Sequence, residues 1–194
     1  MRTIHLTTPI SKVDDLRIGD QVYVSGLIAI LRDQAQKRFI EAKTMGLWVP
    51  DIEGLPIFHC GPLAYMDDGR WVIKSIGPTT SARMEKDLPI LIRLSGVKMI
   101  IGKGGVSRNI ADEMIKLGAV YCAYPGGASA FLLKTFRKVV NVYWLDLGIP
   151  EALWILEFED LGPLTVAIDL QGGNIYSQVE DNVKRMLSKL LGGR

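Results

Sequence analysis

Cysteine is scarce in this sequence, which has only Cys60 and Cys122 among 194 residues. The two lie far apart in apolar, strand-like segments and form neither a C-x-x-C pair nor a metal-ligand spacing. We interpret both as buried thiols, although a disulfide between them stays open. Because an iron–sulfur cluster normally requires three or four thiolates, this chain cannot hold such a cluster alone. The low cysteine content and the lack of a signal peptide lead us to expect a cytoplasmic protein.

Long hydrophobic runs and basic clusters are also absent. No apolar run approaches the ~20 residues that a membrane-spanning helix needs, so we expect no membrane partner. The net charge is +2 and the basic residues are dispersed, which argues against nucleic acid as a partner. Hydrophobic residues make up 48% and charged residues 23%, a balance that excludes extensive disorder. We expect residues 1–194 to form a single domain, because a chain of this length buries a sizeable core.

The motifs of nucleotide binding and of nucleophilic catalysis are incomplete. Residues 102–107 read Gly-Lys-Gly-Gly-Val-Ser, which begins like a G-x-G-x-x-G fingerprint but ends in serine. A P-loop fails too, because glycine follows the Gly-Lys pair where serine or threonine is needed. No G-x-S-x-G occurs, and His5 and His59 lie far from any serine in a recognisable motif. His59 and Cys60 could form a metal-ligand pair, but neighbours on a strand point to opposite faces. We therefore interpret His59 as a satisfied buried histidine.

The sequence does contain a strand, a glycine turn and a helix, three times in succession. The turns are Gly77-Pro78, the run Gly102–Gly105, and Pro125–Gly127. This pattern predicts an α/β fold with a mixed, partly parallel sheet and glycine-rich strand-to-helix turns.

The last third of the chain predicts further elements. A helix follows the third glycine turn and runs through Phe136, and two separate strands are expected at 154–158 and 164–168. The final element is an amphipathic C-terminal helix over 174–194, with Asn174 as its N-cap.

The stretch Ile73–Met84, the first of the three units, carries two polar residues of interest. It predicts a strand, a turn and a helix that runs to about Leu94, with Pro89 as a potential break into two pieces and Asp87 as the cap of the second. Thr79 and Arg83 are four residues apart, so on a helical start they would share one face. Two interpretations are open: an ordinary capped helix with Arg83 in solvent, or an anion site at the helix N-terminus.

Three cations accompany the strand ends. Arg83 follows the first glycine turn, Lys103 lies inside the second, and Arg32 follows an earlier strand, just before a helix. Ligands of open α/β sheets collect at the carboxyl ends of the strands, where these side chains could line one crevice. Arginine binds a carboxylate through two parallel hydrogen bonds and lysine adds a point charge, which predicts a small ligand with two carboxylates. The alternative is that each is an ordinary surface cation.

Several short motifs in a fixed order give the sequence a resemblance to a known family. They are Arg32-Asp33-Gln34-Ala35, Gly61-Pro62, Gly77-Pro78-Thr79-Thr80, Arg83-Met84, Ile101-Gly102-Lys103-Gly104 and Gly148-Ile149-Pro150-Glu151-Ala152-Leu153-Trp154. In this order they resemble the class I fumarases. The chain is similar to the C-terminal, or β-subunit, half of the iron–sulfur hydro-lyases, which include fumarase and L-tartrate dehydratase. The resemblance extends from about Thr7 to about Gly173.

The resemblance implies a swivelling-type β/β/α domain that works against a separate N-terminal half. In the family, three cysteines of that half hold a [4Fe–4S] cluster. The cluster is therefore expected on a partner α subunit, in an α2β2 assembly, and no metal ligand is expected in this chain. The implied reaction is the reversible hydration of the dicarboxylate fumarate to (S)-malate.

The resemblance also implies roles for four residues. Arg32, Arg83 and Lys103 match the carboxylate-binding cations of the family, and Thr79 matches the threonine proposed as catalytic base. A threonine hydroxyl is a poor base at neutral pH, so nearby cations would have to stabilise its alkoxide. Gln36 stands where the family commonly has histidine.

Two alternatives to a fumarase β subunit stay open. The first is the β subunit of L(+)-tartrate dehydratase, because the sequence around Lys103 and the segment Gly148–Glu151 look closer to the two-subunit enzymes. The second belongs to a different class, a non-catalytic anion-binding or regulatory domain.

Overall fold

The computed structural model describes residues 1–191 and has nine strands and five α-helices in that range. The strands are β1 (Thr3–Thr7), β2 (Gln21–Ile30), β3 (Ile57–Phe58), β4 (Leu63–Asp67), β5 (Arg70–Ser75), β6 (Met99–Gly102), β7 (Val120–Ala123), β8 (Phe136–Tyr143) and β9 (Leu153–Ile168). The helices are α1 (Asp33–Thr44), α2 (Leu88–Ser95), α3 (Arg108–Lys116), α4 (Ser129–Leu132) and α5 (Ile175–Leu191). The predicted α/β class is confirmed.

Seven strands form one sheet in the order β1-β2-β3-β6-β7-β9-β8, and β4 and β5 form a separate hairpin. Each neighbouring pair from β1 to β7 is parallel, whereas β9 is antiparallel to β2, β7 and β8. The predicted mixed, partly parallel sheet is therefore confirmed. Because β9 pairs with β2 as well as with β7, the strands β2, β3, β6, β7 and β9 form a closed circuit. The carboxyl ends of the parallel strands lie together at one edge, which we call the carboxyl edge.

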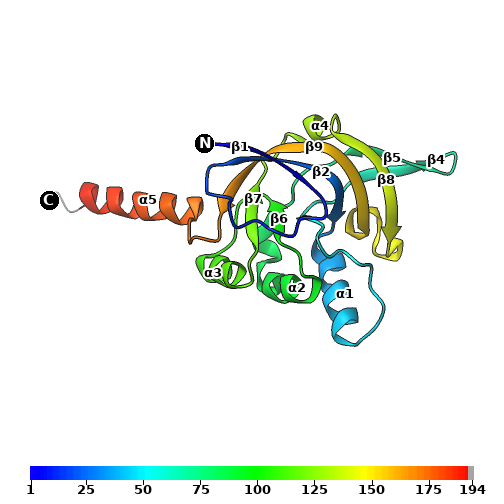
Figure 1. Ribbon diagram of the computed structural model, residues 1–194, viewed down its shortest axis with the longest axis horizontal. Helices are drawn as coiled ribbons and strands as arrows, with labels where there is room; N and C mark the ends of the chain where they lie inside the picture. Colours follow the sequence, from blue (N-terminus) through cyan, green and yellow to red (C-terminus); the bar gives the residue numbers. More distant parts are fainter. Residues whose placement is uncertain (192–194) are drawn as a thin grey trace.

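Alternating residues along these strands supply two apolar clusters, as period-2 patterning requires. On β2, Ile28 and Ile30 belong to one cluster, and Ala29 to the other. The second cluster also contains Phe39 of α1 and Leu91 of α2, together with residues of α3. Helices α1, α2 and α3 accordingly cover the same side of the sheet (Figure 1).

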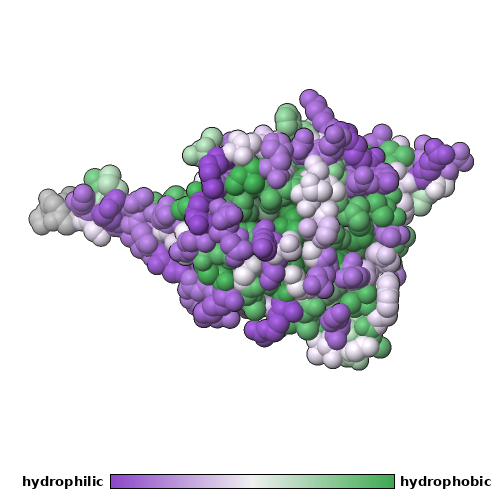
Figure 2. Space-filling view, in the orientation of Figure 1, coloured by the Kyte–Doolittle hydropathy of each residue, from purple (hydrophilic) through white to green (hydrophobic). Residues whose placement is uncertain are grey.

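Helix α5 projects from the body of the protein (Figure 1). The Asn174 side-chain oxygen accepts a hydrogen bond of 3.1 Å from the Ser177 N–H, so the predicted N-cap is confirmed. Exposed apolar side chains occupy part of the helix surface, next to the hydrophilic residues that Figure 2 shows; they are Val179, Val183, Met186, Leu187, Leu190 and Leu191. The helix expected over 174–194 is observed over Ile175–Leu191, and 192–194 lie outside the described residues. Within 1–191, no helix is both long and apolar enough to cross a membrane.

The expected elements of the last third are right in type but wrong in extent. The helix expected through Phe136 is only the short α4, because β8 begins at Phe136 and pairs with β9. The strands expected at 154–158 and 164–168 form the single 16-residue β9. Although Gly162-Pro163 interrupts the apolar pattern, β9 pairs with β2 on both sides of it, and these ladder hydrogen bonds keep the strand continuous.

Trp154 lies where β9 pairs with both β2 and β8, opposite Ile30 and Val142. Its side chain is fully buried, and its indole N–H donates a 3.0 Å hydrogen bond to the Ile149 carbonyl. We expect Trp154→Phe to lower the free energy of unfolding by about 2–3 kcal/mol, because it removes this bond and leaves a cavity. Trp48→Phe is the matched control, since that indole is largely exposed and its replacement should cost less than about 0.5 kcal/mol. Urea unfolding measures both, and equal losses would contradict the assignment of Trp154 to the core.

Candidate functional site

Two of the predicted site residues, Arg32 and Lys103, follow strand ends at the carboxyl edge of the sheet, as does His59. Arg32 follows β2, His59 follows β3, and Lys103 follows β6 directly. Because β2 pairs with β3 and β3 pairs with β6 in parallel, these three strand ends are adjacent. This edge is where α/β sheets commonly bind ligands.

Thr79 lies in the segment Gly77–Ser81, which follows the β4–β5 hairpin and lies at the carboxyl edge. The Thr79 N–H donates to the His59 carbonyl at 2.7 Å, and the Lys103 N–H donates to the Thr79 carbonyl at 3.4 Å. The Ser81 N–H in turn donates to the Lys103 carbonyl at 3.0 Å. The segment therefore behaves as a short extra strand between the residues that follow β3 and β6, and Thr79 is held by its backbone on both sides.

The helix expected after this segment is wrong in its first part, although the piece expected after Asp87 is observed as α2. Ser81–Arg83 form one 3-10 turn, a second such turn follows at Glu85–Asp87, and the α-helix begins only at Leu88. Thr79 consequently does not share a helical face with Arg83. The physical reason is that the Thr79 backbone is committed to hydrogen bonds with neighbouring strand ends.

Arg83 reaches the first residue of α1. Its Nη2 atom lies 2.6 Å from the Asp33 carboxylate, and the Arg83 side chain remains 53% exposed. The ion pair orients the guanidinium while leaving most of its five N–H groups for another acceptor. An exposed pair of this kind adds little stability, so its main consequence is the position of Arg83.

Arg32, the residue before α1, is paired with a carboxylate from another part of the chain. Its Nε atom lies 2.7 Å from Glu151 Oε1, in an ion pair that is not aligned as a hydrogen bond. The Gln34 N–H donates to the other Glu151 oxygen at 2.9 Å. Gly61 provides the space for this pair, because a Cβ atom there would lie 2.6 Å from the Arg32 Cζ. Arg32, just before α1, and Arg83, which reaches the first residue of α1, thus each lie beside one carboxylate.

Lys103 differs from the two arginines because it makes no ion pair within residues 1–191. It borders a cavity of about 650 Å³ that extends over the turn after β7 to the start of α5. Thr80, Tyr124 and Tyr176 also line this cavity. The structure thus brings Lys103 and Thr79 together through backbone hydrogen bonds and leaves the ammonium group without a carboxylate partner there.

Beneath the Gly77–Ser81 segment lies a buried polar chain that the sequence analysis missed. His59 Nδ1 lies 2.9 Å from Ser81 Oγ, which lies 2.9 Å from the Tyr121 hydroxyl. All three residues are fully buried, and burial lowers the pKa of His59 to about 4, so the ring is neutral near pH 7. The expectation of a satisfied histidine is right for Nδ1 and wrong for Nε2, which has no partner within the described residues. His59 and Ser81 are 22 residues apart in the sequence, and Ser81 and Tyr121 are 40 residues apart, so no local motif indicates these two contacts.

Gln36, which replaces the histidine common in the resembled family, is buried behind the same turn. Its Nε2 donates a 3.0 Å hydrogen bond to the Met84 carbonyl, whereas its Oε1 has no partner within residues 1–191. Gln36 therefore supports the 3-10 turn that carries Arg83.

The cysteines do not fit an iron–sulfur cluster. Cys60 and Cys122 are both free and buried, and burial raises the pKa of each thiol to about 12, which disfavours the thiolate that a metal requires. The prediction of buried thiols is confirmed. Across the described part of the chain, no group of three or more histidine, cysteine, aspartate or glutamate side chains is placed to hold a metal ion.

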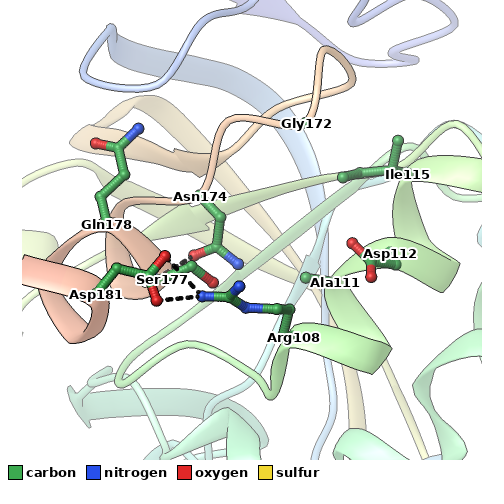
Figure 3. Close-up of a pocket in the computed structure, with 9 residues that line it drawn as sticks. All are labelled: Arg108, Ala111, Asp112, Ile115, Gly172, Asn174, Ser177, Gln178 and Asp181. Atoms are coloured by element: carbon green, nitrogen blue, oxygen red, sulfur yellow. Dashed lines mark hydrogen bonds and ion pairs between the residues drawn. The ribbon is translucent and has the colours of Figure 1, made fainter. Parts of the chain in front are cut away.

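A separate cavity of about 280 Å³ lies between α3 and the start of α5 (Figure 3). Arg108 points across it to Asp181, and its Nη2 lies 2.9 and 3.0 Å from the two carboxylate oxygens. Since this guanidinium is already paired and none of the predicted site residues lines the cavity, we interpret it as the joint that fastens α5 to α3.

Comparisons with known proteins identify the family. The family model described as the fumarase C-terminus matches residues 1–179. The chain is 41% identical over 182 residues to the "Putative L(+)-tartrate dehydratase subunit beta" of Methanocaldococcus jannaschii, covering 93% of each chain. It is 36% identical over 176 residues to the L(+)-tartrate dehydratase subunit beta of Escherichia coli K12, covering 89% of this chain and 86% of that one.

A longer relative matches the same part of the fold. The "Putative fumarate hydratase class I" of Geobacillus stearothermophilus is 31% identical over 191 residues, which cover 97% of this chain but 36% of that protein. With the family model matched over nearly the whole length and relatives above 30% identity, the chain belongs to the fumarase C-terminus family.

Proposed function

We propose that this chain is the β subunit of a two-subunit hydro-lyase that hydrates fumarate reversibly to (S)-malate. The observation that carries the proposal is the position of Thr79. Backbone hydrogen bonds hold it beside Lys103 at the carboxyl edge, and two further cations, Arg32 and Arg83, lie at the start of α1. A potential base next to several cations suits the chemistry of a dicarboxylate.

The cations have complementary tasks in this proposal. Arg32 and Arg83 bind substrate carboxylates with N–H groups that Glu151 and Asp33 leave unused, and these two acids hold the guanidinium groups in place. Lys103, which has no carboxylate partner within 1–191, adds the third positive charge.

Thr79 acts as the base in the dehydration direction. Its deprotonated hydroxyl takes a proton from the carbon beside one carboxylate, and the C–O bond of the neighbouring carbon breaks to release hydroxide. The hydroxide then takes up the proton held by Thr79, so that fumarate and water form and the base is regenerated. An alkoxide is strongly disfavoured in water, so the adjacent cations must lower the pKa of Thr79. The same cations stabilise the charge that develops on the substrate carboxylate, and this electrostatic contribution is the larger one.

The proposal requires a partner. A [4Fe–4S] cluster, if the complex uses one, belongs to an α subunit, because the two buried cysteines here do not fit it. The α subunit would also complete the substrate pocket, and we propose an α2β2 assembly.

A second candidate function is the dehydration of L(+)-tartrate. It is favoured by the names of the M. jannaschii and E. coli relatives, which match this chain over most of their length at 41% and 36% identity. Tartrate is also a four-carbon dicarboxylate, so Arg32, Arg83, Lys103 and Thr79 would keep the same tasks.

Reconstitution tests the proposal. We expect the isolated chain to show no hydro-lyase activity, and to gain it when purified without oxygen together with an α chain that carries three cluster cysteines. Turnover of fumarate, (S)-malate and both tartrates, followed by absorbance or NMR, distinguishes the two candidate functions. Activity of the isolated, iron-free chain would contradict the two-subunit proposal. A complex that binds dicarboxylates without turning them over would instead support an anion-binding module.

Removal of the proposed base gives the second test. Thr79→Ala should lower kcat of the complex by about 10²–10⁴-fold, the usual contribution of a general base, while the thermal unfolding midpoint stays unchanged. Thr79→Ser is the matched control, because it keeps the hydroxyl and the backbone hydrogen bonds. If Thr79→Ala retains near-normal kcat, another group is the base.

The cations give a third test. Arg83→Met or Lys103→Met should raise KM for the dicarboxylate about 10–100-fold, since each removes charged hydrogen bonds worth about 1.5–3 kcal/mol. Lys138→Met is the matched control, because Lys138 is exposed on β8 and pairs with Glu157, outside the carboxyl edge. Steady-state kinetics of the complex provide the comparison. An unchanged KM would mean that Arg83 and Lys103 are ordinary surface cations.

A further inference from the structure

The buried chain His59–Ser81–Tyr121 is tied through the backbone to both Thr79 and Lys103. The His59 carbonyl accepts the Thr79 N–H at 2.7 Å, and the Ser81 N–H donates to the Lys103 carbonyl at 3.0 Å. The side chains of His59 and Ser81 lie 2.9 Å apart. The backbone of His59 thus holds Thr79, the proposed base, and the backbone of Ser81 holds Lys103, the proposed cation. Tyr121, from β7, anchors the other end of the chain.

Burial makes the hydrogen-bonded chain His59–Ser81–Tyr121 rigid. A buried hydroxyl or imidazole that loses its partner costs about 1–3 kcal/mol, so Ser81 cannot move away from His59 and Tyr121 without a penalty. Ser81 supplies the one side-chain hydrogen bond to the His59 ring within residues 1–191, because Nε2 has no partner there.

The end of β6 leaves space for the hydrogen-bonded side chains of Ser81 and Tyr121. Gly102 has no side chain, and a Cβ atom there would collide with Ser81 Oγ and lie 2.9 Å from the Tyr121 hydroxyl. The residue before Lys103 must therefore be glycine for the three polar groups to meet, which connects the Gly-Lys motif to the buried chain.

We propose that His59, Ser81 and Tyr121 are positioning residues that fix the Gly77–Ser81 segment, and with it Thr79, relative to Lys103. The inference rests on the proposed function and deepens it, because it assigns the alignment of the base to side chains that never touch substrate. Proton transfer requires accurate placement, and a displacement near 1 Å can cost about 100-fold in rate. Binding by three cations tolerates such a displacement better, so the effect falls on kcat rather than on KM.

Ser81→Ala tests the proposal in the complete complex, with Ser95→Ala as the matched control. Ser95 is also a buried serine, but its hydroxyl donates to the Leu91 carbonyl within α2. We expect Ser81→Ala to lower kcat about 10–100-fold and to change KM less than about threefold, while Ser95→Ala leaves both within about twofold. Tyr121→Phe should act in the same direction, about 3–10-fold, and replaces Ser81→Ala if that variant fails to fold.

Amide hydrogen exchange in the isolated full-length chain gives a readout that does not depend on turnover. We expect the N–H groups of Thr79 and Ser81 to exchange at least about tenfold faster in Ser81→Ala or Tyr121→Phe, and at the wild-type rate in Ser95→Ala. Faster exchange with unchanged kcat would overturn the positioning role. Exchange and kinetics that match the Ser95→Ala control would overturn the proposal as well. A wild-type complex that is inactive on every dicarboxylate would refute the proposed function, while the exchange rates would still decide whether the buried chain fixes the segment.

Discussion

The backbone hydrogen bonds that hold Thr79 between His59 and Lys103 are the interaction on which the candidate site depends. β3 and β6 pair directly over only two residues each, and the Gly77–Ser81 segment inserts where they separate. A hydroxyl-bearing residue is thereby fixed by main-chain groups on two sides rather than by its own side chain. Main-chain positioning leaves the Thr79 hydroxyl free, but it requires that both flanking strands end where they do.

Charge is distributed unevenly over the carboxyl edge. The two arginines each sit beside a carboxylate, Asp33 or Glu151, whereas Lys103 has none within the described residues. The carboxylates fix two planar guanidinium groups at the start of α1, so part of the entropy of ordering these long side chains is lost during folding rather than on binding. Such preorganisation is typical of sites built to bind anions.

Local patterns in the sequence predicted the elements that local interactions determine. β2, the glycine turn after β6, the Asn174 cap and the placement of Arg32 and Lys103 at strand ends follow from alternation, turn chemistry and parallel pairing. Long-range hydrogen bonds decided the rest. They replaced the helix after Thr79 by a 3-10 turn, and joined two expected strands into β9. The contact of Ser81 with His59 and Tyr121 depends on three strand ends meeting in space, which no local pattern encodes.

The two thiols have a consequence for the chemistry that the protein withstands. Thiolates, not thiols, react with peroxides and disulfides. Cys60 and Cys122 are both buried, and burial raises the pKa of each thiol to about 12. Burial and the raised thiol pKa both slow this chemistry, so Cys60 and Cys122 are poor targets for oxidation in the folded chain.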